Sequence, residues 1–311
     1  MSGDQDANSI AELTQSICNY HNQIETLILR YRKKIEQLER NLPSGTTILP
    51  GSYWRLVAFC DSLVKVRIYI ERNFTYIESL GVLSLTRYIF ELSVWVNLLE
   101  QDERYGLVYY QRLLENNKRF YSDLKSHLLR EADLFKRIGE KEIDRIKSMV
   151  TTSVGTLTSE EVAKRVRAVE EKIDAEIGLS LCIYGAEAKI KGYGFQAHLI
   201  ETQAVTQASS TLEQIETELK QFNERWSASI KDIAAVKWNW RAQAKLVGMV
   251  DDYDFIYSYT SRLLHAEPIS LTTNQKSLEN KEVCLFLRYI LIKVSELMQK
   301  TTNLINIGTL H

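Results

Sequence analysis

The sequence has few of the residues that interrupt helices. Its 311 residues include three prolines and thirteen glycines, and its polar residues do not form long low-complexity tracts. We therefore expect an ordered chain, with disorder only at the N-terminal MSGDQDAN and in the last few residues. With a hydrophobic content of 45%, the chain is long enough for one large domain or two small ones with a substantial core.

The sequence also lacks clustered metal ligands and paired cysteines. No two cysteines form a Cys-x-x-Cys pair, and the five histidines are scattered. The four cysteines are far apart, at Cys18, Cys60, Cys182 and Cys284. A zinc site or a disulfide framework would need such clusters. We therefore expect buried, reduced thiols, no metal and no cofactor.

An excess of charge of either sign is missing too. The chain has 39 basic and 40 acidic residues, so no global field would steer it to nucleic acid or to an acidic membrane. The N-terminus is polar and acidic, unlike a signal peptide. The longest apolar stretch, residues 81–100, contains Arg87 and Glu91, which argues against a membrane span. We expect a soluble, cytoplasmic protein without membrane contact.

Several motifs of well-known enzyme classes are missing. The sequence has no phosphate-binding Gly-x-x-x-x-Gly-Lys-Ser/Thr loop, no Gly-x-Ser-x-Gly and no His-Glu-x-x-His. The KGYGFQ segment contains two glycines, but no strand precedes it, so we interpret it as a helix break. The acidic residues are spread over solvated helix faces. Nucleotide-binding folds, serine hydrolases and zinc peptidases are therefore not indicated.

What the sequence does contain is helical periodicity almost throughout. Apolar residues alternate in steps of three and four along residues 9–41, which predicts one helix of roughly 50 Å. Further helices are expected over residues 52–80, broken by Gly81, then over 82–100 and 105–150. A capping box at Thr158 or Ser159, with acids at 160 and 161, starts another. These patterns predict an all-α, multi-helix antiparallel bundle with long coiled-coil-like helices.

The expected organisation has four parts. They are a long N-terminal helix and loop (1–50), a first half of the helical core (51–152), a helical hairpin that could project (153–235) and a second half of the core (236–311). Heptad seams in separate helices could equally mark one elongated bundle or a dimer interface. A homo-oligomer or a helical protein partner is therefore expected.

Arg87 and Glu91 form the first constellation of interest. They lie four residues apart inside the most apolar predicted helix, where an unpaired charge would be costly. A structural ion pair is slightly favoured. In the alternative interpretation, Arg87 presents a fixed cation to an anionic group and Glu91 orients it.

The second constellation lies in the segment YDFIYSYTSRLLHAEP, residues 253–268. Tyr257, Ser261 and His265 follow one another at four-residue spacing, so a helix places them on one face. Glu267-Pro268 should end that helix, and a cation near its C-terminus is favoured by the helix dipole. His265 is therefore expected to titrate near neutral pH.

Three interpretations of this row are open. His265 and Ser261 could act as base and nucleophile, or His265 could be the acid/base for an RNA 2′-hydroxyl while Arg262 or Arg87 holds the phosphate. Acyl transfer would need an oxyanion hole that nothing here resembles, so phosphodiester chemistry ranks above it. In the structural interpretation, His265 caps the helix and Tyr257 covers the core.

The same residues carry a family resemblance. Trp240, Tyr253, Tyr257, Ser261 and His265, with Arg87 and Glu91 on the earlier apolar helix, resemble a bacterial all-helical family of unknown function. Its members are similar to HEPN-like proteins, a group rich in toxin–antitoxin and phage-defence ribonucleases. The resemblance covers about half the chain, mainly residues 80–100 and 237–300.

The resemblance implies an RNA-targeting toxin or phage-defence effector that needs no metal. His265 would be its acid/base, Arg87 and Arg262 would face the phosphate, and Glu91, Tyr257 and Ser261 would orient them. Two departures are visible. Ala266 stands where glycine is common, and only two residues separate Arg262 from His265, whereas HEPN ribonucleases have four to six residues between Arg and His. The alternative function is a non-catalytic helical scaffold or interaction protein whose polar row is structural.

Overall fold

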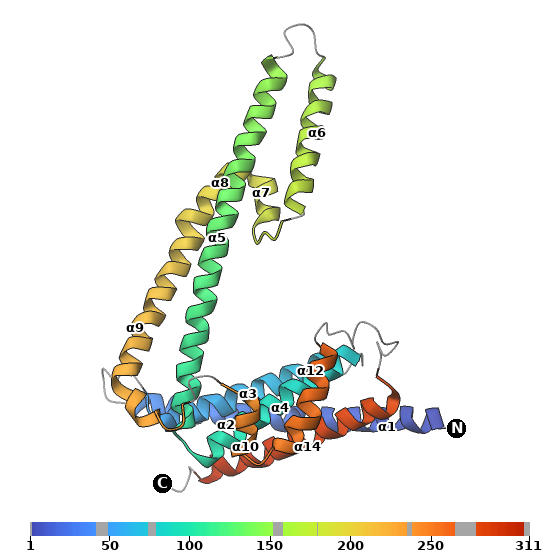
Figure 1. Ribbon diagram of the computed structural model, residues 1–311, viewed down its shortest axis with the longest axis vertical. Helices are drawn as coiled ribbons and strands as arrows, with labels where there is room; N and C mark the ends of the chain where they lie inside the picture. The colour runs from blue at the N-terminus through green and yellow to red at the C-terminus, as the bar shows by residue number, and fades with distance from the viewer. Residues whose placement is uncertain are drawn as a thin grey trace. The chain divides into compact units, whose positions relative to one another are not determined.

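The computed structural model is all-α, as predicted (Figure 1). It describes residues 2–41, 49–73, 79–151, 158–178, 180–234, 238–264 and 278–307. Across these ranges every regular element is a helix. The chain divides into two compact units: unit 1 comprises residues 1–111 and 222–311, and unit 2 comprises residues 112–221. The borders between the units therefore fall inside two long helices, α5 (Tyr105–Thr151) and α9 (Val205–Ile230).

Unit 1 begins with three helices, and the expected single helix over residues 9–41 is divided into two. Helix α1 spans Ser2–Cys18 and α2 spans His21–Arg40, with a turn at residues 19 and 20. The amide of Tyr20 donates to Ile17 O, three residues back, so the helix tightens there. Asn19 favours such a turn, a local effect that the apolar periodicity does not reveal. Helix α3 follows over Gly51–Asn73.

Helix α4 (Ser79–Gln101) is the central helix of unit 1. Ten of its residues are buried, because α14, α12, η2 and α3 all pack against it. The predicted break at Gly81 is wrong, since α4 runs through it; a glycine inside a helix costs only about 1 kcal/mol relative to alanine. By length and composition α4 is also the one helix of the described chain that could cross a membrane, and 56% of its apolar window is buried inside the protein.

In the C-terminal part of unit 1, a series of short helices precedes the long helix α14. Helix α10 (Trp240–Leu246) is capped by the side chain of Asn239, which accepts a hydrogen bond from Ala242 N at 3.0 Å. It is followed by α11 (Val250–Asp252), the π-helix η2 (Tyr253–Tyr257), α12 (Ser258–Leu264) and the long α14 (Asn280–Ile307).

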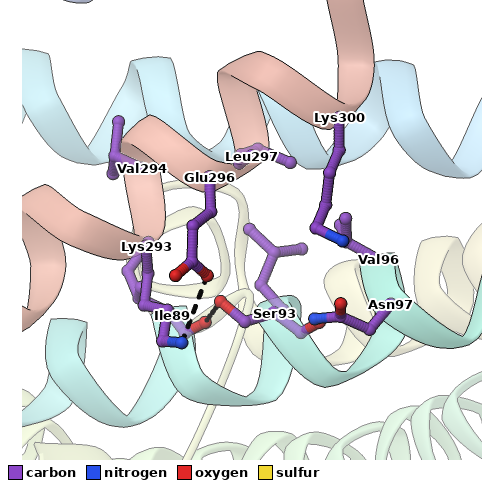
Figure 2. A pocket seen from close by; sticks show the side chains of 10 residues that line it. Ile89, Ser93, Val96, Asn97, Lys293, Val294, Glu296, Leu297 and Lys300 are labelled. Atoms are coloured by element: carbon purple, nitrogen blue, oxygen red, sulfur yellow. Dashed lines mark hydrogen bonds and ion pairs between the residues drawn. The ribbon is translucent and has the colours of Figure 1, made fainter. Parts of the chain in front are cut away.

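Polar contacts fasten α14 to the rest of unit 1. The Lys293 ammonium lies 3.2 Å from Asp252 of the preceding segment, and Tyr31 of α2 donates to Thr301 O at 2.8 Å in the core. Figure 2 shows side chains of α4 and α14 around a cavity of about 10 Å³. A space of that size holds about one water molecule.

Unit 2 is built from consecutive chain. It contains the remainder of α5, then α6 (Ser159–Gly178), α7 (Gly185–Lys191), α8 (Tyr193–Leu199), the π-helix η1 (Ile200–Ala204) and most of α9. The predicted capping box is confirmed, because Thr158 N donates to Glu161 and Glu161 N donates to Thr158 Oγ1. Its core gathers Leu128, Ala132, Phe135, Ile138, Ile173, Ala188, Tyr193, Ala197, Ile200 and Ala208.

Candidate functional site

Two segments far apart in the sequence meet at Arg87. Helix α4 carries Arg87, whose Nε lies 3.1 Å from Glu91 Oε1, so the predicted ion pair is confirmed. Its Nη2 donates to Tyr257 Oη of η2 at 3.0 Å, and the guanidinium carbon lies 4.8 Å from the centre of the Tyr257 ring. We call Arg87, Glu91 and Tyr257 the arginine cluster. Its members come from the two constellations that the sequence singled out.

The arginine cluster is half-buried, and this affects its protonation. The side chains of Arg87 and Glu91 are 27% and 25% exposed. Burial raises the pKa of the Glu91 carboxyl above its usual value, and the hydrogen bond from Arg87 only partly opposes that shift. Glu91 therefore takes up a proton more readily than an exposed glutamate. Protonation would weaken its hold on Arg87.

Aromatic packing positions Tyr257. Its ring lies 4.9 Å from that of Tyr253, nearly parallel at 17°, and 5.3 Å from that of Phe90. Burial raises the pKa of the Tyr257 phenol, while Arg87 lowers it. The phenol therefore stays protonated near neutral pH and accepts from Arg87 while its own proton is available to another acceptor.

The polar row after Tyr253 does not lie on a continuous α-helix. Residues 253–257 form a π-helix, and Ser258 Oγ donates to the carbonyl of Tyr253, five residues back, at 3.2 Å. A π-bulge inserts an extra residue into a helix and is frequent at functional sites. The sequence could not predict this, because the apolar and polar spacing is compatible with an ordinary α-helix.

The structure places the other predicted site residues differently. Ser261 lies one turn beyond Tyr257 in α12, and its Oγ is buried without a hydrogen-bond partner among the described atoms. Arg262 is exposed, and no described contact joins it to Arg87 or Tyr257. His265 lies outside the described residues; in the sequence it directly follows Leu264, the last residue of α12.

Sequence reasoning missed a neighbouring group of tyrosines. Tyr88 follows Arg87 on α4, and its ring lies 4.7 Å from that of Tyr69 on α3. Tyr109 of α5 donates to Asp61 of α3 at 2.9 Å. Burial raises the pKa of both Tyr88 and Tyr109. A search for tyrosines beside Arg87 would have found Tyr88, but Asp61 and Tyr109 carry no motif.

The described residues contain no cluster of metal ligands, and the two large surface hollows lie away from the arginine cluster. Within the described ranges no three His, Cys, Asp or Glu side chains gather as metal ligands, and no disulfide joins the cysteines. One open hollow of about 710 Å³ lies between the α1–α2 turn and α14, and another of about 340 Å³ lies in unit 2. Neither is lined by the arginine cluster.

No family model, curated protein or solved structure matches this chain. A half-buried guanidinium is suited to an anion with two oxygens, such as a phosphodiester, because its planar N–H groups match that geometry. A carboxyl with a raised pKa and a protonated phenol stand directly beside it.

Proposed function

We propose that this protein is a HEPN-like, RNA-targeting effector of the toxin or phage-defence type, which cleaves RNA without a metal ion at the arginine cluster. The observation that carries the proposal is the hydrogen bond between Arg87 and Tyr257. This bond joins the Arg87 guanidinium of α4 to Tyr257 of η2. In the sequence, Tyr257 is followed at four-residue intervals by Ser261 and His265.

The reaction assigned to this site is an internal phosphodiester transfer. A base removes the proton from a ribose 2′-hydroxyl, and the 2′-oxygen attacks the adjacent phosphorus. The bond to the 5′-oxygen breaks, and this oxygen leaves with a proton from an acid. His265 supplies the acid/base function, Arg87 and Arg262 stabilise the charge on phosphorus, and Glu91, Tyr257 and Ser261 orient these groups.

Glu91 has a specific part in this proposal. In the structure its carboxylate occupies one edge of the Arg87 guanidinium. A phosphate would compete for that edge, and a proton on Glu91 would release it. The raised pKa of Glu91 makes such proton uptake less costly. Binding of RNA should therefore strengthen as the pH falls toward the usual carboxyl range.

The decisive experiment compares cell growth and RNA integrity after induction of wild type, His265→Ala and Arg87→Ala. We expect growth arrest and fragmented RNA with wild type only. His198→Ala is the matched control, because His198 is exposed on α8 in unit 2. Circular dichroism shows whether each variant is folded. Intact RNA with folded wild type would contradict the proposal.

A second function is favoured by a different observation. Four large apolar side chains between residues 181 and 195 are strongly exposed: Leu181 (88%), Ile183 (52%), Ile190 (85%) and Phe195 (55%). Such exposure in one short segment is typical of a protein–protein contact. In this alternative the chain is a non-catalytic scaffold that self-associates or binds a helical partner through unit 2, and the arginine cluster is a structural ion pair.

Sedimentation of the purified protein tests the alternative. Self-association through this segment predicts an oligomer in wild type and a monomer in Ile190→Glu. Leu285→Glu is the control, because Leu285 is also exposed but lies on α14 in unit 1. Equal masses for all three proteins would contradict self-association through residues 181–195.

A further inference from the structure

Four residues on one face of α4 are accessible, although ten of the 23 residues of this helix are buried. Ser84, Tyr88, Glu91 and Trp95 are spaced by four, three and four residues, so they lie on one side of the helix; we call them the α4 strip. Ser84 is exposed and the other three are partly exposed. Core packing does not explain why polar and aromatic side chains on the central helix are accessible, so this face is a candidate binding surface.

At its C-terminal end the α4 strip meets a group of aromatic rings. The Trp95 indole stacks on that of Trp238, with centroids 4.4 Å apart and planes 13° apart. Tyr109 stands edge-on to Trp95 at 6.1 Å, and Trp240 stands edge-on to Trp238 at 5.6 Å. The two stacked indoles are neither fully buried nor fully exposed. Part of each of these two indoles is therefore within reach of solvent.

The arginine cluster lies on the flank of the same strip. Arg87 and Trp95 are eight residues apart on α4, which is about 12 Å along the helix axis. The two nearby carboxylates already have partners, since Glu91 accepts from Arg87 and Asp61 accepts from Tyr109. The Arg87 guanidinium, which is paired with Glu91, and the Trp95 indole thus follow one another along α4, and Trp95 stacks on Trp238.

We propose that Trp95 and Trp238 are a stacking platform for an unpaired base of single-stranded RNA, whose backbone passes Arg87. Every base has a π-face, so such a platform binds strands with little sequence preference, while the phosphates are held by cations. In a duplex the bases are stacked on each other and cannot reach the platform. The inference rests on the proposed function and adds a subsite and a strand preference to it.

Binding of a fluorescein-labelled oligoadenylate, followed by fluorescence anisotropy in the cleavage-disabled His265→Ala background, tests the platform. We expect Trp238→Leu to weaken binding by roughly 5- to 150-fold, the effect of losing one base stack. Trp238→Phe keeps an aromatic face and should largely restore binding. Trp226→Leu is the control, because Trp226 is a partly exposed indole on α9 outside the Trp95 group. The duplex with oligouridylate should bind more weakly than the single strand.

Several outcomes would overturn the inference. They are no binding of oligoadenylate, equal affinity of Trp238→Leu and its parent, an equal loss in Trp226→Leu, and equal affinity for the duplex. If Trp238→Leu does not fold, oxidation mapping by mass spectrometry replaces it, and oligoadenylate should protect Trp95 and Trp238 from N-bromosuccinimide. Lack of protection would then overturn the inference.

The outcome is separable from that of the proposed function. If wild type cleaves RNA but binding does not depend on the tryptophans, the platform proposal is wrong and the ribonuclease proposal stands. If binding depends on the tryptophans but wild type does not cleave RNA, the ribonuclease proposal is wrong and the platform proposal stands.

Discussion

The two units of this protein use carboxylates withdrawn from solvent in different ways, one fully buried and one half-buried. In unit 2 the Glu131 side chain is 1% exposed and accepts hydrogen bonds from the amides of Ile183 and Tyr184, at the start of α7. In unit 1 the Glu91 side chain is 25% exposed and holds the guanidinium of Arg87. Glu131 accepts from backbone amides that the start of α7 leaves unpaired, and it also lies 3.5 Å from His127 Nε2. Glu91 instead accepts from a charged side chain, that of Arg87.

The units also differ in how their cores are assembled. Unit 2 uses one continuous stretch of chain, and its ion pairs, such as Lys136–Glu201 and Lys141–Glu176, are largely exposed. Unit 1 joins both ends of the sequence, with Tyr31 bonded to Thr301 and Arg87 to Tyr257. The polar contacts of unit 1 thus join its N-terminal and C-terminal parts, and this is where we place the candidate site.

The largest expected effect is a loss of stability in unit 1 from Gly106→Ala. A Cβ at Gly106 would lie 2.2 Å from Gly51 O and 2.7 Å from Arg55 N, both backbone atoms that cannot move aside. We expect the free energy of unfolding to fall by about 3 kcal/mol or more. Urea denaturation followed by circular dichroism measures it.

Two other glycines serve as references for that change. In unit 2 a Cβ at Gly139 would lie 3.2 Å from Gly194 N, so Gly139→Ala should cost less than Gly106→Ala. Gly81→Ala meets nothing within 4 Å and should stabilise α4 by roughly 0.5–1 kcal/mol. Equal effects of all three substitutions would refute the close approach of α3 and α5 at Gly106.

The next effect is local to unit 2. Glu131→Gln removes the charge from an acceptor of two backbone hydrogen bonds, and such charge-assisted bonds contribute about 1.5–3 kcal/mol. We expect faster hydrogen exchange of the Ile183 and Tyr184 amides, with RNA binding unchanged. Glu140→Gln is the control, because Glu140 is exposed on the same helix. Unchanged exchange in Glu131→Gln would contradict the capping role.

A smaller effect on stability, but a large one on function, is expected in the arginine cluster. Tyr257→Phe removes the acceptor of the Arg87 hydrogen bond and should cost about 1 kcal/mol of stability. RNA cleavage should fall more than the stability loss explains. Lys136→Ala breaks an exposed ion pair in unit 2 and should cost at most about 1 kcal/mol and leave cleavage intact. Unfolding curves and cleavage rates of both variants make the comparison.

The smallest effect is a difference in pH dependence between the units. The pKa of Glu91 is raised by burial, so the stability of wild type relative to Glu91→Gln should fall as the pH rises through that raised pKa. The pKa of Glu161 is lowered, first by the hydrogen bond from Thr158 N. Wild type relative to Glu161→Gln should therefore lose stability as the pH falls through that lowered pKa.

Unfolding at several pH values between the acid range and neutrality shows both slopes. Opposite slopes are expected because one carboxylate is disfavoured by desolvation and the other is favoured by a backbone donor. Slopes of the same sign would mean that Glu91 is not held in a desolvated site.

Some of the site was predictable because its cause is local. The Arg87–Glu91 pair follows from a four-residue spacing inside an apolar helix, and the Thr158 capping box follows from four adjacent residues. The approach of Tyr257 to Arg87, 170 positions apart, depends on how α4 and η2 pack. No local rule predicts such a contact.

The π-helix and the aromatic platform were beyond sequence reasoning for a related reason. Residues 253–257 have the spacing of an α-helix, and η2 forms where the segment packs against α4 and α10. Trp238 stands in a segment without clear periodicity, and its stacking on Trp95 is a tertiary contact with α4.

The sequence by itself determined that this protein is all-α, because the 3.6-residue periodicity and the scarcity of helix breakers act within each segment. It also determined the i, i+4 pair and the capping box, which are short-range interactions. Only the tertiary structure decided which helix became the core of unit 1, which face of that helix stayed accessible, and which distant tyrosine met Arg87. These depend on the burial of apolar surface by whole helices, a sum over many contacts that no single segment contains.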